Sequence, residues 1–184
     1  MQGRKRKRLL NQQMIVAEAV ALLNEGGLDN LSLRKLADRL NVSAPSIYRH
    51  FADKADLLVA VLDMLFFEVL HAVPEHRDPA RWMEAFGEVF WRKLMAVRDY
   101  GRLVLVTEIK PEQVARTVAT VRARLEPLAM PTDEALNLQS SIQALLIGWA
   151  SFAHAPYGAS LEQYLPIQEL ALRDMRRLIA AYCE

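Results

Sequence analysis

Apolar side chains recur three and four positions apart along most of the 184-residue chain. This spacing places them on one face of a helix. Sustained alternation of apolar and polar residues, which is typical of strands, is almost absent, and no Asn-Gly or Asp-Gly hairpin signal occurs. The pattern therefore predicts an all-α protein. Besides two short helices near residues 32–51, helices are expected at about 8–25, 54–72, 80–97, 101–108, 111–127, 133–154 and 160–182.

Glycine and proline divide this pattern into two parts. Gly26-Gly27 ends the first helix, and prolines bracket a polar linker that follows the helix at 54–72. Short helices precede this linker, and long helices with many more apolar positions follow it. We expect a three-helix DNA-binding domain with a basic N-terminal arm over residues 1–53. A larger helical bundle for ligand binding and dimerisation is expected over residues 54–184.

The shortest predicted helix lies in the stretch NVSAPSIYRHF, residues 41–51. Pro45 suits the first turn of a helix, where backbone N–H groups have no partner, and Ser43 suits the N-cap before it. Two short helices joined by about three residues are typical of a helix-turn-helix, whose second helix enters the major groove of DNA. Only the first two turns of such a helix reach base edges, so it needs no greater length.

The second helix would be anchored on the core by Val42 and Ile47, while the small Ala37 allows the two helices to cross closely. The side chains expected to point outward are Ala44, Pro45, Ser46, Tyr48, Arg49 and His50. The flanking cations suited to phosphates are Arg34, Lys35 and Lys54. Phosphate contacts fix register, whereas base contacts read sequence. Structural packing for Tyr48 and helix capping for His50 are the alternatives.

Charge is divided unevenly along the chain. Residues 1–54 contain ten Lys or Arg against five Asp or Glu, whereas residues 55–184 contain thirteen against seventeen. The first part therefore carries about +5 and the second about −4, and such an asymmetry indicates that the basic part meets a polyanion. The arm Arg4–Arg8 follows the minor groove, raises non-specific affinity, or is a solvated tail.

Other classes of protein fit the sequence less well. The single cysteine, Cys183, excludes an intrachain disulfide and cysteine-based zinc sites, and it fits a reducing compartment. Glu18 interrupts the apolar stretch behind the basic arm, so no export signal is expected. The apolar run near residues 142–155 contains polar residues and is too short for a bilayer. We expect a cytoplasmic protein without a metal, a cofactor or a membrane partner.

The stretch LLNEGGLDNLSLRKLADRLNVSAPSIYRHFADKADLL, residues 22–58, resembles the DNA-binding domain of the tetracycline-repressor (TetR) family. The match includes the glycine before the second helix, the Leu-Ala pair within it and the run Tyr-x-His-Phe-x-x-Lys that starts at Tyr48. The resemblance implies an all-helical homodimeric repressor that binds a near-palindromic DNA operator. It also implies that the larger domain binds a small-molecule effector and thereby releases DNA.

Matching the family position by position places Arg34, Lys54 and the six outward residues of the short helix at DNA-contacting positions. Ala44 and Ser46 are small and offer only a methyl group or a hydroxyl. Arg49 is the strongest candidate for reading guanine, because a bidentate arginine–guanine pair gives ~1–3 kcal/mol of discrimination.

Residues 90–114 resemble the tetracycline repressors themselves through a phenylalanine, an Arg-Asp pair and a Lys-Pro-x-Gln run. In those repressors a histidine holds magnesium and an asparagine contacts the drug. Alignment places apolar residues near Val106 and Phe86 at these positions, while Phe90 matches an aromatic pocket residue. The resemblance therefore implies an effector other than a tetracycline–magnesium complex.

Large side chains gather on the helices that would enclose such an effector. The candidate ligand contacts are Phe67, His71, Phe86, Phe90 and Trp149. Ligand pockets are mostly apolar with a few placed polar groups, so an apolar or aromatic effector is expected. A plain core role is the alternative, since an aromatic stripe at helical spacing is also typical of packing.

The last two predicted helices carry broad apolar faces. Their members are Leu138, Ile142, Leu145, Leu146 and Trp149 on the first, and Leu161, Tyr164, Leu165, Leu172, Met175, Leu178 and Ile179 on the second. One pair of helices cannot cover both faces, but two pairs around a twofold axis can. A homodimer is therefore expected, with packing inside one subunit as the alternative.

A helical ligand carrier or an enzyme without specific DNA binding is the alternative class. An enzyme would need a catalytic or metal constellation, and the sequence contains no Gly-x-Ser-x-Gly elbow or glycine-rich phosphate loop. An activator, or a regulator without a ligand, would keep the same fold. Salt-dependent binding to DNA separates a regulator from a carrier.

Overall fold

The computed structural model describes residues 10–183. The predicted arm Arg4–Arg8 and the first residues of the helix expected from residue 8 lie outside this range. Every described element is helical, which confirms the all-α class. No described helix has both the length and the apolar run needed to cross a bilayer. The elements are α1 (Gln12–Gly26), the 3-10 helix η1 (Leu28–Asn30), α2 (Leu33–Arg39), α3 (Ala44–Tyr48), α4 (Lys54–Ala72), α5 (Pro79–Ala96), α6 (Tyr100–Val106), α7 (Pro111–Leu125), α8 (Thr132–Ala153), α9 (Gly158–Leu161) and α10 (Ile167–Cys183).

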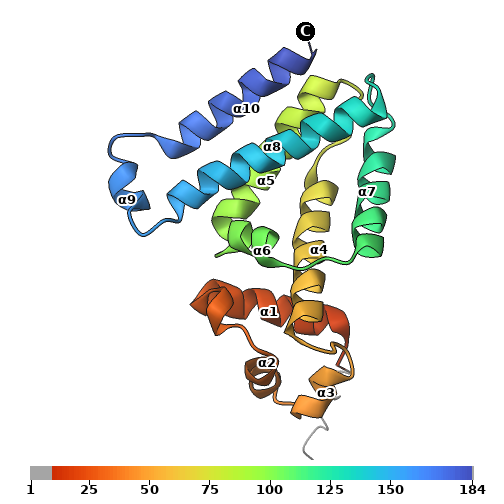
Figure 1. Ribbon diagram of the computed structural model, residues 1–184, viewed down its shortest axis with the longest axis vertical. Helices are drawn as coiled ribbons and strands as arrows, with labels where there is room; N and C mark the ends of the chain where they lie inside the picture. Colours follow the sequence, from red (N-terminus) through yellow and green to blue (C-terminus); the bar gives the residue numbers. More distant parts are fainter. Residues whose placement is uncertain (1–9, 184) are drawn as a thin grey trace, which may run out of the picture.

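α1, α2 and α3 form a small N-terminal unit beside a larger bundle, and α4 runs from one into the other (Figure 1). α4 packs on α1, and it also packs on α5 and α6 of the bundle. All of its buried side chains except Val59 belong to a single core that includes residues of both parts. The domain boundary between residues 53 and 54 therefore stays a prediction, since α4 contributes to the packing of both parts.

Side-chain caps fix where several helices begin. Ser32 Oγ accepts a backbone N–H three residues further on at 3.2 Å, and Asp53 Oδ1 does the same at 2.8 Å, which confirms both predicted caps. Each such cap satisfies an N–H group that the helix leaves unpaired and contributes about 1 kcal/mol. Ser43 precedes α3 with extended backbone, but its hydroxyl bonds Ser46 Oγ at 2.8 Å instead of a backbone N–H.

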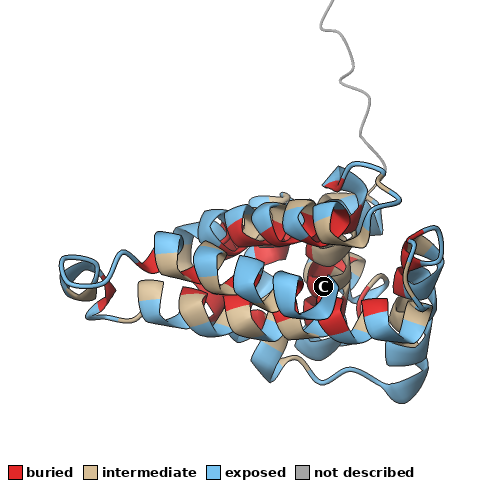
Figure 2. Cartoon of the chain, turned by 90° about the horizontal axis from the view of Figure 1, so that it is seen from above, coloured by how far each residue is buried: buried red, intermediate tan, exposed pale blue. Residues whose placement is uncertain are grey.

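Aromatic rings occupy the centre of the larger part. Trp82, Phe86 and Phe90 stack along α5 with centroid separations of 5.5 and 5.7 Å, and Tyr100 of α6 meets Phe90 edge-on at 5.9 Å. All four side chains are at most 1% exposed. α5 also packs against α8 and α10, which pack against each other. Figure 2 shows the buried positions of the helices facing one another and the exposed positions facing outward.

The prediction of one helix over 160–182 is wrong, because the chain forms α9 and α10 there with a break at residues 162–166. Pro166 explains the break, since proline has no N–H for an intrahelical bond and its ring clashes with the carbonyl four residues earlier. The carboxylate of Glu162 accepts the N–H of Ile167 at 3.2 Å and thereby supports the start of α10. The break lets α10 return along α8 and α5.

Part of the apolar surface predicted to meet a second subunit is buried inside this one. The residues concerned are Leu138, Ile142 and Leu146 of α8 and Met175 and Ile179 of α10, each at most 2% exposed. Their burial follows from the mutual packing of α5, α8 and α10. Tyr164 and Leu165 remain exposed.

Gly87 lies where α5 meets α10, and a Cβ added there would overlap the sulfur of Met175. Gly87→Val should therefore lower the free energy of unfolding by ~1–3 kcal/mol, because the added methyl groups overpack this contact. Ala119→Val, at an exposed position of α7, is the matched control and should cost less than ~1 kcal/mol through helix propensity alone. Urea unfolding at one protein concentration measures both variants. Equal losses would mean that α10 adjusts freely and that Gly87 is not required for the close approach.

Candidate nucleic-acid interface and ligand cavity

α2, a tight turn and α3 form the helix-turn-helix arrangement that the sequence predicts. Asn41 has left-handed backbone angles in the turn (φ 52°), which asparagine tolerates better than most residues. The N–H of Val42 donates to the carbonyl of Ala37 at 3.0 Å. Ala37 and Ile47 are at most 2% exposed, so each helix has an anchor in the core.

The outward side of α3 carries the predicted base contacts. The structure leaves Pro45, Tyr48 and Arg49 exposed and Ala44, Ser46 and His50 half-buried. The guanidinium of Arg49 donates to Ser46 Oγ at 3.2 Å. This bond directs Arg49 along the first turn of α3, which is the end that a groove-inserted helix presents to base edges.

The three predicted phosphate contacts differ in their surroundings. Arg34 is exposed at the start of α2. The ammonium group of Lys35 bonds the side chain of Asn30, and Lys54 Nζ donates to the carbonyl of Leu28 at 3.1 Å. Lys35 therefore attaches η1 to α2, and Lys54 attaches η1 to the start of α4. Each ammonium group has three N–H donors, which leaves donors for a phosphate.

Arg39 contributes little net charge to this surface. Its guanidinium pairs with Glu18 and with Glu25 on α1. The hydrogen bond from Arg39 lowers the pKa of the Glu25 carboxyl, so this acid remains ionised at neutral pH. The cation thus connects α2 to α1 rather than to a ligand.

A junction between η1 and the start of α6 was missed by sequence reasoning. Asp99 has left-handed backbone angles (φ 58°), and its carboxylate accepts the N–H of Leu28 at 2.8 Å. Arg102 forms two bonds of 2.9 Å to the carboxylate of Asp29, and these bonds lower the pKa of Asp29. The Arg-Asp pair at residues 98–99 was the available sequence signal, but nothing in its spacing identifies the partner.

A cavity of about 210 Å³ lies between α4, α6, α7 and α8. Its wall is mostly apolar and includes Phe66 of α4 and Val118 of α7. Polar groups reach it from Asp63, Tyr100 and Gln139. Burial raises the pKa of the Tyr100 phenol, so this group stays protonated at neutral pH.

The structure does not bring the five predicted ligand residues to one site. Phe86 and Phe90 belong to the aromatic stack and are not among the residues that line the cavity. Phe67 and His71 border a separate hollow of about 460 Å³, and Trp149 is half-buried on α8. Helical spacing identifies an apolar face, but it does not say whether a neighbouring helix covers that face.

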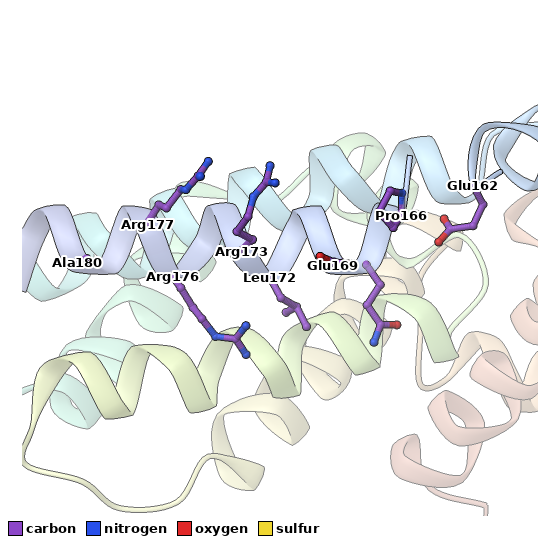
Figure 3. Close-up of a pocket in the computed structure, with 9 residues that line it drawn as sticks. Glu162, Pro166, Glu169, Leu172, Arg173, Arg176, Arg177 and Ala180 are labelled. Atoms are coloured by element: carbon purple, nitrogen blue, oxygen red, sulfur yellow. The ribbon is translucent and has the colours of Figure 1, made fainter. Parts of the chain in front are cut away.

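A wider hollow of about 890 Å³ follows α10. Figure 3 shows Arg173 and Arg177 extending to one side of this helix and Arg176 extending to the other side, toward α5. Arg176 bonds Glu88 of α5 at 3.1 Å. The hollow carries both signs of charge and runs over the surface, which distinguishes it from the mostly apolar cavity between α4, α6, α7 and α8.

Comparison with known sequences finds one family and several repressors. The family described as bacterial regulatory proteins, tetR family, matches residues 15–61. The chain is 32% identical over 141 residues to the tetracycline repressor protein class A from transposon 1721 of Escherichia coli, a match that covers 76% of this chain and 65% of that protein. The class C repressor of Escherichia coli is 33% identical over 115 residues, which cover 61% of this chain and 52% of the repressor. The chain thus spans less than two thirds of the length of these relatives.

Comparison with solved structures extends the similarity to the whole architecture. A TetR variant from Acinetobacter baumannii AYE, in complex with minocycline, is similar with a TM-score of 0.75. The two chains are 26% identical, and the match covers 94% of this chain and 96% of the other. The likeness therefore includes both the N-terminal unit and the bundle.

Replacing Asp99 tests the junction between η1 and α6. Asp99→Ala leaves the partly buried N–H of Leu28 without its acceptor, so we expect the free energy of unfolding to fall by ~1–3 kcal/mol. Asp99→Asn keeps an acceptor oxygen and tolerates the positive φ, so it should retain most of the stability. Asp29→Ala removes only an exposed ion pair and should have little effect. If urea unfolding found Asp29→Ala as damaging as Asp99→Ala, the ion pair and not the Leu28 bond would hold the junction.

Proposed function

This chain belongs to the TetR family of bacterial regulatory proteins, and we propose that it is a transcriptional regulator that binds double-stranded DNA and responds to a small molecule. The arrangement of α2, the turn and α3 carries the proposal, because it exposes one side of α3 as a recognition helix requires. The two relatives described above are named as repressors. Their names support repression as the result of DNA binding by this chain.

In the proposed complex, α3 enters the major groove and Arg49 reads guanine, since a guanidinium forms a bidentate pair with O6 and N7. The cations Arg34, Lys35 and Lys54 contact phosphates beside the groove and set the register of α3. The remaining contact surface consists of Ala44, Pro45, Ser46, Tyr48 and His50. Tyr48 is 55% exposed, which favours a role in contact over a role in packing.

A homodimer is proposed from the apolar surface that stays open near α8 and α10. Tyr164 is 82% exposed, Phe152 is 47% exposed and Leu165 is 40% exposed. Pairing of α8 and α10 with the same helices of a second subunit would cover such side chains and fill the hollow along α10. A twofold axis there would place the two copies of α3 about 34–36 Å apart, which favours a near-palindromic operator.

The proposed effector site is the cavity between α4, α6, α7 and α8, whose mostly apolar wall suits a small apolar or aromatic molecule. Two of its helices also reach the N-terminal unit, α4 through α1 and α6 through the bond between Asp99 and Leu28. A ligand that favours one position of these helices would change the spacing of the two α3 helices and release DNA. The apolar residues near Phe86 and Val106 favour an effector other than a tetracycline–magnesium complex.

Selection from random duplexes tests the function and supplies the probe for Arg49. The purified protein should retain duplexes that share a near-palindromic motif. Its affinity should fall as the salt concentration rises, because binding releases counterions from the DNA phosphates and added salt opposes that release. Arg49→Ala should weaken binding to the selected duplex by ~1–3 kcal/mol and leave binding to random DNA nearly unchanged. Arg92→Ala, at an exposed position of α5, removes the same charge and should change neither.

Fluorescence anisotropy with both duplexes measures these affinities. Equal losses on the two duplexes would reassign Arg49 to a phosphate contact. Retention of duplexes without any shared motif would favour a helical ligand carrier or enzyme over a specific regulator.

Gly148 on α8 offers a test of the dimer. A Cβ added at this position meets open space in the subunit, so Gly148→Arg should leave the fold intact while placing a charge in the proposed interface. We expect a mainly monomeric protein in sedimentation equilibrium and at least about a tenfold loss of affinity for the selected duplex. Ala119→Arg on α7 is the matched control and should stay dimeric. A Gly148→Arg protein that remains dimeric would contradict pairing through α8.

A further inference from the structure

Asp63 of α4 places a carboxylate in the wall of the cavity between α4, α6, α7 and α8. The side chain is half-buried, and this burial raises the pKa of its carboxyl. Arg116 of α7 offsets part of that effect through its charge. None of the ion pairs formed by residues 10–183 involves Asp63. A partly desolvated carboxylate without a cation in contact is costly, and a bound cation removes that cost.

The rest of the wall determines what kind of cation fits. Phe66, Val118 and Leu136 contribute apolar surface from three different helices. The cavity measures about 210 Å³, whereas an apolar cavity of roughly 150 Å³ is large enough for benzene. A hydrated metal ion would leave this apolar surface uncovered, while a molecule with one or two rings would cover it.

An amide pair lies on the α8 side of the same cavity. Gln139 is 1% exposed, and its Nε2 donates to Oε1 of Gln143 at 2.7 Å. This bond uses one N–H and one lone pair, so the two amides keep an oxygen acceptor and N–H donors for another partner. Both residues line the cavity, and their mutual bond holds these groups in place for a polar substituent of a ligand.

We propose that this cavity binds a small aromatic amine in its protonated form, with the ammonium group on Asp63 and the rings against Phe66 and Val118. The Gln139–Gln143 pair contacts a hydroxyl or carbonyl substituent on the far side of the ring. An anionic ligand is disfavoured because Asp63 lines the cavity, whereas Arg116 is exposed and is not among the lining residues. The identification of this amine as the effector rests on the proposed function, but its binding does not require DNA.

Three probes of one shape and different charge test the proposal: 1-naphthylmethylamine, 1-naphthylmethanol and 1-naphthoate. Isothermal titration of the full chain at neutral pH should show the amine binding at least about tenfold more tightly than the alcohol, and the acid binding most weakly. Asp63→Asn should bind the amine no better than the alcohol while keeping its affinity for the alcohol. Glu134→Gln, at an exposed position of α8, removes a carboxylate outside the cavity lining; it is the matched control and should keep the wild-type order.

A second variant keeps the test decisive if Asp63→Asn fails to fold. Arg116 is exposed, and its charge competes with a ligand cation for Asp63. The Arg116→Ala protein should therefore bind the amine more tightly than the wild type. A wild-type protein that binds the alcohol or the acid as tightly as the amine would overturn the proposal. An amine preference that survives in Asp63→Asn would also overturn it.

Release of the selected duplex by 1-naphthylmethylamine is measured separately, so the two proposals can fail independently. Amine binding that depends on Asp63 supports the ligand site whether or not DNA is bound. If the protein retains no shared DNA motif, the proposed function fails while the titrations still decide the chemistry of the cavity.

Discussion

Burial of one face of α4, from Leu57 to Leu70, is the constraint on which the rest of the structure depends. Leu57, Val61, Leu65 and Val69 recur every fourth residue and are at most 1% exposed, so one core extends from the N-terminal unit into the bundle. Packed interiors deform little, so a displacement of α4 at the cavity would also move the part of α4 that packs on α1. The bond from Asp99 to the backbone at Leu28 attaches α6 to the same unit. Two helices that line the cavity thus also hold the unit that carries α3.

Ion pairs with acidic side chains neutralise some cations in and beside the N-terminal unit and leave others available for a ligand. Arg39 is paired with acids of α1, and Arg102 of the bundle pairs with Asp29. Lys54 donates to the backbone carbonyl of Leu28 in η1. Arg34 and Arg49 are exposed on α2 and at the end of α3, and neither forms an ion pair with another described residue. A charge counted over a sequence segment gives the sign of the field, whereas side-chain pairing gives its location.

The aromatic stack and the cavity lie next to each other in the bundle, and Tyr100 belongs to both. The rings of Trp82, Phe86 and Phe90 stack along α5 and are at most 1% exposed, and Phe90 also meets Tyr100 of α6. The cavity lies instead beside α7, which packs on α8 and follows α6 through residues 107–110. Valine, threonine and glutamine side chains line much of this region, and their volumes leave space that the aromatic stack does not. The space for a ligand therefore lies beside the aromatic stack, on the side of α7, with Tyr100 at the boundary.

The sequence by itself determined the helices, the caps at Ser32 and Asp53, the helix-turn-helix and the family, because periodicity, capping and turn chemistry act between residues close in the chain. It also contained Pro166, but apolar residues at helical spacing on both sides of that proline predicted one continuous helix instead of α9 and α10. Only the tertiary structure decided that the rings of α5 are core, that Asp63 lines the cavity, and that Asp99 bonds Leu28 across 71 positions. Burial and long-range pairing depend on which helix faces meet, and the spacing of residues along one helix does not specify its neighbour.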